Sequence, residues 1–327
     1  MKKGDRLSAG MTAALLTPLF MGMAPVFGKL AIRTGIDPYT LAALRTCLAA
    51  LARWVVFALF FRQYTFIFPA GLMGTAAVGA VNGLGSLLYY NGLLLLDDAS
   101  LAQMLNMAYV LFALLMTHAA GHRISALSVG RAALALLAVY LLAAAGPAGA
   151  VGHWAGVGLM LGAACLYALH VSLSQRVMFE MPAPTMTLYS MTFMGLTVLI
   201  ARLIVGRFGG LPWGPLMPHG WWFIAGLAGV TALSRLTLFA GVRNLGGLQT
   251  VLLNMAEMGV TLLVAFLWLG ETMTLWQWAG VLIMAISVLL ANYEDDARRL
   301  WGRLCPPRSA PDVPVQAATT HSAEQRP

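Results

Sequence analysis

The sequence predicts an all-α integral membrane protein with ten transmembrane helices, arranged as two inverted five-helix repeats. Three observations lead to this fold class. Hydrophobic residues make up 60% of the 327 residues and charged residues only 10%, against about 25% charged residues in a soluble domain. Apolar runs of roughly 20 residues, the length that crosses a bilayer, recur along the chain. The two halves also resemble each other at an offset of about 149 residues.

Turn-forming residues separate the apolar runs. Asp37-Pro38 opens the second predicted helix, Phe68-Pro69 the third and Pro182-Ala183-Pro184 the seventh. Because the connections are short, consecutive helices must run antiparallel. The predicted ranges are 10–32, 38–61, 69–94, 99–119, 126–145, 154–178, 184–205, 220–242, 247–269 and 273–292.

Repeated motifs define the halves. Leu105-Asn106-Met107-Ala108 recurs as Leu253-Asn254-Met255-Ala256, and Gly121-His122 corresponds to Gly270-Glu271. Five helices per half is an odd number, so the halves insert with opposite orientations and leave the working site between them. The predicted units are residues 1–150 and 151–293. A disordered cytoplasmic tail is expected at 294–327, where apolar runs give way to charged residues, prolines and small polar residues.

Arginine and lysine positions predict the orientation. Lys2, Lys3, Arg6 and most loop arginines fall on the side of the amino terminus, which places both termini in the cytoplasm of a multi-pass inner-membrane protein. The net charge of +8 reflects this bias and no nucleic-acid partner, because the arginines are scattered singly between apolar runs. The expected partners are membrane lipid, a small-molecule substrate and a coupling proton, and the sequence leaves open a monomer or a homodimer.

Glu257 is the most informative charge, because it lies in the middle of the ninth helix. A glutamate there is protonated, paired with a cation or exposed to a wet cavity. Arg235 is the candidate partner, because it lies on the other helix of the same predicted hairpin. Measured from the cytoplasmic turn of that hairpin, Glu257 lies at a depth of roughly 16 Å and Arg235 at roughly 12 Å. Two interpretations stay open, a buried ion pair that only fixes helix register and a role in binding substrate or proton.

Other polar residues within the predicted helices are candidates for a cavity wall. Arg45 lies too deep in the second helix to be dismissed as a side chain that reaches water. Lys29 and Arg202, near helix ends, are expected to snorkel to the membrane surface. The remaining candidates either bond neighbouring helices or line the cavity. The candidate substrate-binding set is Glu257, Arg235, Arg45, Asn106, Asn254, Gln103, Tyr89, Tyr109 and Ser86.

Enzyme and metal signatures are missing from the sequence. It contains no HExxH, no GxSxG with triad partners and no phosphate-binding GxxxxGK[ST] loop. Cys47, Cys165 and Cys305 form no CxxC pair, so neither a zinc site nor a cofactor is expected. Two other classes stay open as alternatives: a membrane-embedded enzyme acting on a lipid or isoprenoid, and a non-transporting membrane scaffold.

Several motifs resemble a known family. Gly270-Glu271, followed by Gly280-Val281-Leu282-Ile283, is similar to the segment that closes each half in EamA-type ten-helix members of the drug/metabolite transporter superfamily, and Ala43-Leu44-Arg45 is similar to its second helix. The resemblance covers about 11–293. It implies a carrier with a central cavity. Glu257 matches a glutamate thirteen residues before the Gly-Glu pair; the family commonly has proline next, whereas Met258 follows here and Tyr109 takes the corresponding first-half position.

The expected function is therefore secondary active transport by alternating access. The substrate is expected to be a small polar or amphiphilic metabolite, amino-acid-like or related, that is exported across the inner membrane. Arg235 or Arg45 would attract its anionic group, and Glu257 would bind an amine or the coupling proton.

Overall fold

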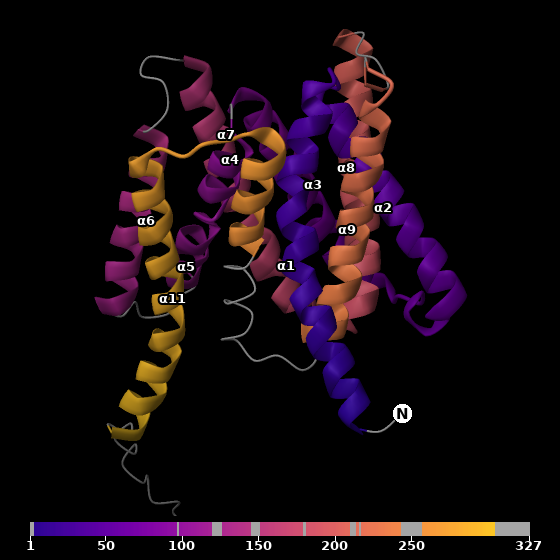
Figure 1. Cartoon of the computed structure of the whole chain (residues 1–327). Coiled ribbons are helices and arrows are strands. Elements are labelled where there is room, and N and C mark those ends of the chain that lie inside the picture. The colour runs from indigo at the N-terminus through magenta and orange to yellow at the C-terminus, as the bar shows by residue number, and fades with distance from the viewer. Residues whose placement is uncertain are drawn as a thin grey trace, which may run out of the picture.

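The computed structural model describes residues 3–96, 98–119, 126–144, 151–178, 181–209, 214–215, 217–242 and 257–304. Within these ranges every regular element is a helix, and the helices pack side by side in a bundle (Figure 1). A described helix lies on each of the ten predicted ranges. The elements are α1 (Lys3–Arg33), α2 (Pro38–Phe60), α3 (Pro69–Leu95), α4 (Ala99–Asn106), α5 (Tyr109–Ala119), α6 (Ala126–Ala144), α7 (Val151–Met178), α8 (Ala183–Gly209), α9 (Gly220–Val242), the helical segment Glu257–Leu269 and α11 (Leu275–Leu304).

Helix α2 starts where the sequence places it. The Asp37 carboxylate accepts hydrogen bonds from the backbone N–H groups of Tyr39 and Thr40, both at 3.0 Å, and Pro38 occupies the first turn. An aspartate cap satisfies N–H groups that have no partner within the helix, and proline costs nothing at that position. Pro69 begins α3 in the same way, which explains why these two boundaries could be read from the sequence.

The fourth predicted helix, 99–119, is not continuous. It consists of α4 and α5, separated by a tight turn at Met107 and Ala108. At the break the hydrogen bonds shorten to three-residue spacing, as in the bonds from Met107 N to Met104 O (3.0 Å) and from Ala108 N to Leu105 O (3.1 Å). No proline or glycine causes this break. It coincides with contacts that hold each piece to a different helix, described below.

The carboxyl-terminal helix also differs from the prediction. Helix α11 continues to Leu304, past residue 294, where the disordered tail was expected to begin. The sequence there pairs Glu294 with Arg298 and Asp295 with Arg299 at four-residue spacing, an order of charges that favours helix. Helix α11 therefore extends further than predicted, the disordered tail expected at 294–327 stays a prediction, and residues 305–327 lie outside the described part.

The packing of the bundle interleaves the two halves. Helix α1 packs mainly against α9, α3 against α7 and α8, α2 against α8 and α9, and α6 against α11. Most of these pairs join a helix of the first half to one of the second. The start of α1 and the end of α11 lie at the same end of the bundle (Figure 1). We call the opposite end, where α1 and α3 finish and α2 and α4 begin, the distal end.

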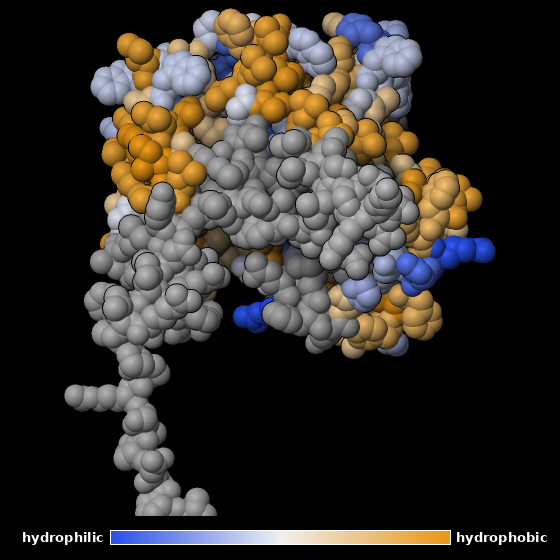
Figure 2. Space-filling model, turned by 60° about the horizontal axis from the view of Figure 1, so that its bottom comes forward, coloured by the Kyte–Doolittle hydropathy of each residue, from blue (hydrophilic) through white to orange (hydrophobic). Residues whose placement is uncertain are grey.

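The outer surface of the bundle is apolar. Large side chains such as Leu59, Phe66, Met73 and Trp222 are more than two-thirds exposed, at 69, 83, 78 and 80%. In the view of Figure 2, hydrophobic residues cover much of the described surface. Five of the described helices are long and apolar enough to cross a membrane, and four further apolar helices are shorter. Exposure of this kind suits a bilayer and not water.

Candidate functional site

A chain of hydrogen bonds links the two halves in the middle of the bundle. Gln103 of α4 donates from Nε2 to Glu257 Oε1 at 2.9 Å, and its own Oε1 accepts from the Tyr89 hydroxyl of α3 at 3.3 Å. Gln103 is 4% exposed. An amide suits this position, because it can donate to a carboxylate and accept from a hydroxyl at the same time. The structure thus brings together three of the candidate site residues.

Arg45 of α2 lies next to this chain. Its Nη2 donates to the Ser86 hydroxyl of α3 at 3.0 Å, and its guanidinium carbon lies 5.1 Å from the centre of the Tyr90 ring. A cation over an aromatic face is attracted by the negative face of the ring. The Tyr90 ring in turn packs edge-on against Tyr89, with the centroids 5.4 Å apart. We call Arg45, Ser86, Tyr89, Tyr90, Gln103 and Glu257 the central polar cluster.

The central polar cluster carries opposite charges from opposite halves. Tyr89 is joined to Glu257 through Gln103, and the Tyr90 ring lies against the Arg45 guanidinium. Tyr109 also packs edge-on against Tyr167 of α7, at 5.0 Å between centroids. Tyrosines therefore lie beside both charged groups. Such a site can bind a small molecule that carries an anionic group at one end and a cationic group at the other.

Tight packing fixes the backbone that carries Glu257. A Cβ added at Gly22 of α1 would lie 2.6 Å from the Glu257 carbonyl oxygen, so only glycine allows this approach. Thr261, one turn after Glu257, donates its hydroxyl to Gly22 O at 2.9 Å and contacts Glu257 O at 3.1 Å. The start of the segment Glu257–Leu269 is thereby attached to α1.

Three candidate residues are not part of the described contacts. Asn106 is half-buried at the end of α4, at the break before α5. Arg235 lies on α9, but its side chain is outside the described part, and Asn254 lies wholly outside it. The ion pair between Arg235 and Glu257 that the sequence suggests therefore stays a prediction.

Glu271, which the sequence analysis used only as a family motif, caps a helix of the other half. Its Oε1 accepts from Ala99 N at 2.7 Å, and its Oε2 accepts from Ser100 N at 3.0 Å and from the Ser100 hydroxyl at 2.5 Å. These donors form the first turn of α4. A carboxylate there satisfies free N–H groups and interacts favourably with the positive end of the helix dipole. Gly270, in the left-handed region at φ 68°, turns the chain into this position.

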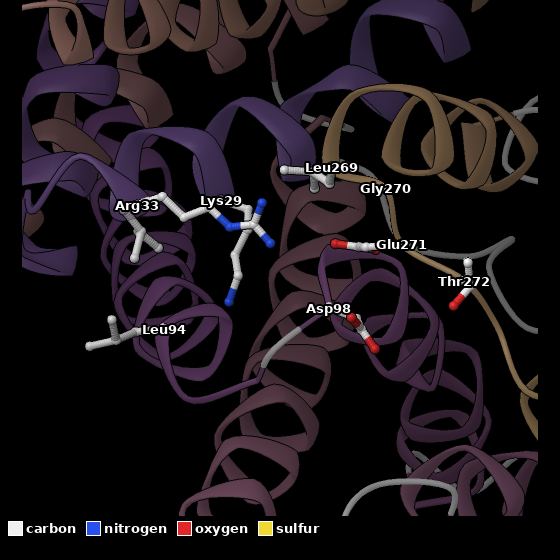
Figure 3. Close-up of a pocket in the computed structure, with 9 residues that line it drawn as sticks. Lys29, Arg33, Leu94, Asp98, Leu269, Gly270, Glu271 and Thr272 are labelled. Atoms are coloured by element: carbon white, nitrogen blue, oxygen red, sulfur yellow. The ribbon is translucent and has the colours of Figure 1, made fainter.

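A pocket of about 590 Å³ opens at the distal end beside Glu271. Figure 3 shows its charged lining, with Lys29 and Arg33 of α1 on one side and the carboxylates of Asp98 and Glu271 on the other. Leu94, Leu269, Gly270 and Thr272 complete much of the wall. No member of the central polar cluster is among its lining residues. We call it the distal pocket.

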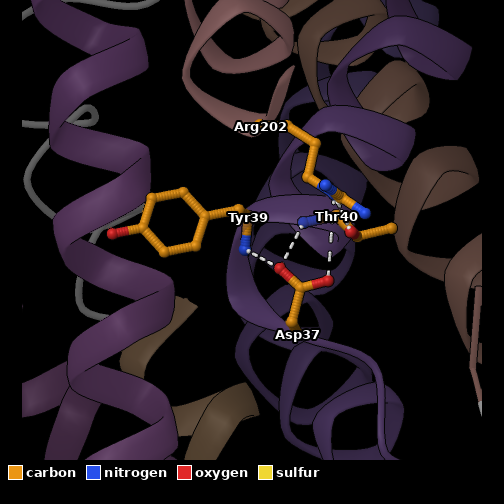
Figure 4. A network of polar contacts seen from close by, with 4 residues as sticks. All are labelled: Asp37, Tyr39, Thr40 and Arg202. Carbon is orange, nitrogen blue, oxygen red and sulfur yellow. Dashed lines mark hydrogen bonds and ion pairs between the residues drawn. The ribbon is translucent and has the colours of Figure 1, made fainter. Parts of the chain in front are cut away.

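Two basic residues that were expected to snorkel are buried instead. Lys29 is 6% exposed and donates to the carbonyl oxygens of Leu93, at 3.0 Å, and Leu96, at the end of α3. Arg202 is 1% exposed; its Nε donates to the Thr40 hydroxyl and lies 3.9 Å from Asp37 Oδ2 (Figure 4). Both side chains find partners at the ends of neighbouring helices, so neither needs to reach water.

Comparison with known proteins identifies the family. Of 24 matching chains of solved structures, one described only as "Crystal structure of protein" is 14% identical, with a TM-score of 0.58 over 90% of this chain and 99% of its own. This likeness shows the fold. No curated protein matches the chain. The model of the EamA-like transporter family matches residues 8–144 and 154–293, once for each half. The match confirms the resemblance that the motifs indicate: the chain belongs to the EamA-like transporter family, whose members are membrane transporters of the drug/metabolite transporter type.

Proposed function

We propose that the protein is a secondary active transporter that exports a small polar or amphiphilic metabolite, amino-acid-like or related, across the bacterial inner membrane. The two halves are inverted repeats that alternate between access to the cytoplasm and access to the outside. Both termini lie in the cytoplasm, so the distal end faces out. The family supports the transporter class, and the features below support the substrate, the mechanism and the orientation.

The packing supports inversion of the halves. In chain order α1 corresponds to α7 as the first helix of each half, and α3 corresponds to α9 as the third. A two-fold axis that relates the halves therefore maps the contact of α1 with α9 onto the contact of α7 with α3. Both of these contacts are extensive. The start of α1 and the end of α11 also lie at one end of the bundle (Figure 1). An axis in the membrane plane is the arrangement that alternating access uses in many carriers.

The observation that carries the substrate class is the arrangement of Arg45 and Glu257. Arg45 comes from the first half and Glu257 from the second, and the two are linked through Tyr90, Tyr89 and Gln103. Within the described part, the Nε of Arg45 is buried and has no hydrogen-bond partner. We propose that this N–H binds a carboxylate of the substrate and that Glu257 binds an ammonium group or a proton. An amino-acid-like zwitterion carries both groups.

Ligand exchange at Glu257 gives the site a means of coupling. A substrate ammonium group that binds the carboxylate competes with the Gln103 amide for the same oxygen. A proton on the same oxygen removes the Gln103 bond by the same competition. Either event breaks the hydrogen bond that joins α4 of the first half to the segment Glu257–Leu269 of the second at this point. Coupling thus takes place at a contact between the halves, where alternating access needs it.

Transport by purified protein in liposomes tests this proposal. The vesicles are loaded with a mixture of proteinogenic amino acids, a pH gradient is imposed, and efflux of each compound is followed by mass spectrometry. The variants Arg45→Gln and Glu257→Gln each remove one charge of the cluster and should lower efflux by roughly tenfold or more, because each loses a charge-assisted contact to the substrate. Arg207→Gln, at an exposed position near the end of α8, is the matched control for loss of a charge and should transport normally.

Two outcomes of the liposome assay would contradict the proposal. If Glu257→Gln retains the native rate and the native dependence on pH, Glu257 takes no part in binding or coupling. If no amino acid moves but another class of compound does, the zwitterion assignment fails while the transporter class stands. Orientation is tested separately: a membrane-impermeant thiol reagent added to intact cells should label Leu275→Cys at the distal end and leave Phe66→Cys unlabelled.

A further inference from the structure

Helix α4 is held at two points in its first half by carboxylates of the other repeat. Its first turn donates three hydrogen bonds to Glu271, through Ala99 N, Ser100 N and the Ser100 hydroxyl. One turn later Gln103 donates to Glu257 at 2.9 Å. The two attachment points lie only about 4.5 Å apart along the helix axis, from Ser100 to Gln103. A helix of eight residues that is fixed twice in so short a span moves as one piece.

Both carboxylates belong to one continuous segment. The helical segment Glu257–Leu269 runs from the central polar cluster to Gly270, whose left-handed conformation places Glu271 against α4. The Glu257 end of the segment is attached to α1 through Gly22 and Thr261. This stretch of the second half is thus joined to α4 twice within about one turn of α4, by Glu271 at Ala99 and Ser100 and by Glu257 at Gln103.

Glu271 lies between the distal pocket and the first turn of α4. It lines the distal pocket, and it is only 8% exposed because its carboxylate is turned onto α4. Lys29 and Arg33 face it across the pocket, and Asp98 lies on its own side (Figure 3). The contact between Glu271 and the first turn of α4 is therefore part of the wall of the distal pocket.

We propose, on the basis of the proposed transport function, that Glu271 is a positioning residue that latches the distal end. It holds α4 against the second half and so keeps Gln103 on Glu257. The latch must release α4 when the central polar cluster opens toward the distal pocket. Loss of the Gln103 bond on substrate binding leaves Glu271 as the remaining attachment of α4 to this segment, so the strength of the latch sets how often the distal end opens.

A distance measurement between the halves tests the latch without any substrate. Cys47, Cys165 and Cys305 are replaced by serine, and spin labels are attached at Leu95→Cys on α3 and Leu275→Cys on α11, positions that are 40 and 87% exposed at the distal end. Pulsed electron paramagnetic resonance on the full-length protein then gives the distribution of distances. Glu271→Gln keeps the shape of the side chain but replaces one acceptor oxygen with an NH₂ group that cannot accept a hydrogen bond.

The expected result is a longer second distance whose population rises roughly tenfold in Glu271→Gln, as the loss of a charge-assisted hydrogen bond predicts. Ser100→Ala removes only the hydroxyl contact and should give a smaller shift in the same direction; it also keeps the test valid if the Glu271 variant does not fold. Thr272→Val, at the exposed neighbouring position in the same pocket, should leave the distribution unchanged.

A latch and a merely structural cap give different results. A cap that serves only stability lowers the melting temperature in both Glu271→Gln and Ser100→Ala but leaves the distances of the folded protein unchanged, and that outcome overturns the proposal. An equal shift in Thr272→Val also overturns it, because the effect would then belong to the loop and not to the carboxylate. The measurement requires no transport, so a failure of the proposed function in liposomes is distinguishable from a failure of the latch.

Discussion

Replacing Asp37 by alanine should destabilise the protein more than the loss of an ordinary helix cap does. The substitution removes two hydrogen bonds to the start of α2, those from Tyr39 N and Thr40 N, a loss of about 1 kcal/mol. It also leaves Arg202, which is 1% exposed, without its acidic neighbour. Two charges 3.9 Å apart attract by about 4 kcal/mol at an effective dielectric constant near 20, and breaking a buried pair costs about 3–5 kcal/mol. The expected loss in unfolding free energy is about 4–6 kcal/mol.

A double-mutant cycle separates the two contributions. Asp37→Asn retains an acceptor for the cap but removes the charge, so it isolates the electrostatic part. Arg202→Met retains most of the buried volume and removes the cation. Unfolding by sodium dodecyl sulfate in mixed micelles, followed by tryptophan fluorescence, gives each free energy. Asp37→Ala combined with Arg202→Met should recover about 2–4 kcal/mol relative to the sum of the single variants. A coupling energy below about 0.5 kcal/mol would refute the ion pair as the source of the stability.

Three further predictions concern contacts that position the central polar cluster. Gly22→Ala should lower the free energy of unfolding by about 1–3 kcal/mol, because the added methyl group meets the Glu257 carbonyl oxygen. The control is Gly259→Ala, where no atom lies within 4 Å of the added carbon. It should be neutral or stabilising in the same micelle assay. Tyr90→Leu should raise the half-saturating substrate concentration in liposomes several-fold, because it removes the ring beneath the Arg45 guanidinium. Tyr90→Phe keeps the ring and should match the native protein. Equal effects of the two variants would show that the ring does not position Arg45. Lys29→Met should lower the free energy of unfolding by about 1–3 kcal/mol, because the carbonyl groups at the end of α3 lose a charged donor; a native melting curve would contradict this.

Strong local signals made much of the fold predictable. Apolar runs long enough to cross a bilayer located the helices, and Asp37-Pro38 marked the start of α2 within one residue because cap and proline act through neighbouring backbone atoms. The break at Met107 was not predictable in the same way. Its neighbours include no helix-breaking residue, and the contacts that accompany it, such as Tyr109 against Tyr167, come from another helix.

The candidate site was predictable in composition but not in connectivity. Glu257, Gln103 and Arg45 were identified because polar groups inside apolar helices need partners. The repeated motif placed Gln103 and Glu257 on corresponding helices, but their bond could not be read from it. For Lys29 and Arg202 the prediction was wrong, because a long basic side chain near a helix end has the same sequence signal whether it reaches water or a polar group of a neighbouring helix. Glu271 was missed as a contact residue because its partners lie 171 and 172 positions away.

The interleaved packing of α1 with α9 and of α3 with α7 has a consequence for biosynthesis. Roughly 190 residues separate the end of α1 from the start of α9, and a ribosome that adds about 5–20 residues per second needs about 10–40 s to make them. During that interval the face of α1 that later meets α9 has only lipid or insertion machinery as a neighbour. The newly made first half must therefore persist in the bilayer as loosely associated helices, and it assembles only when translation of the second half is well advanced.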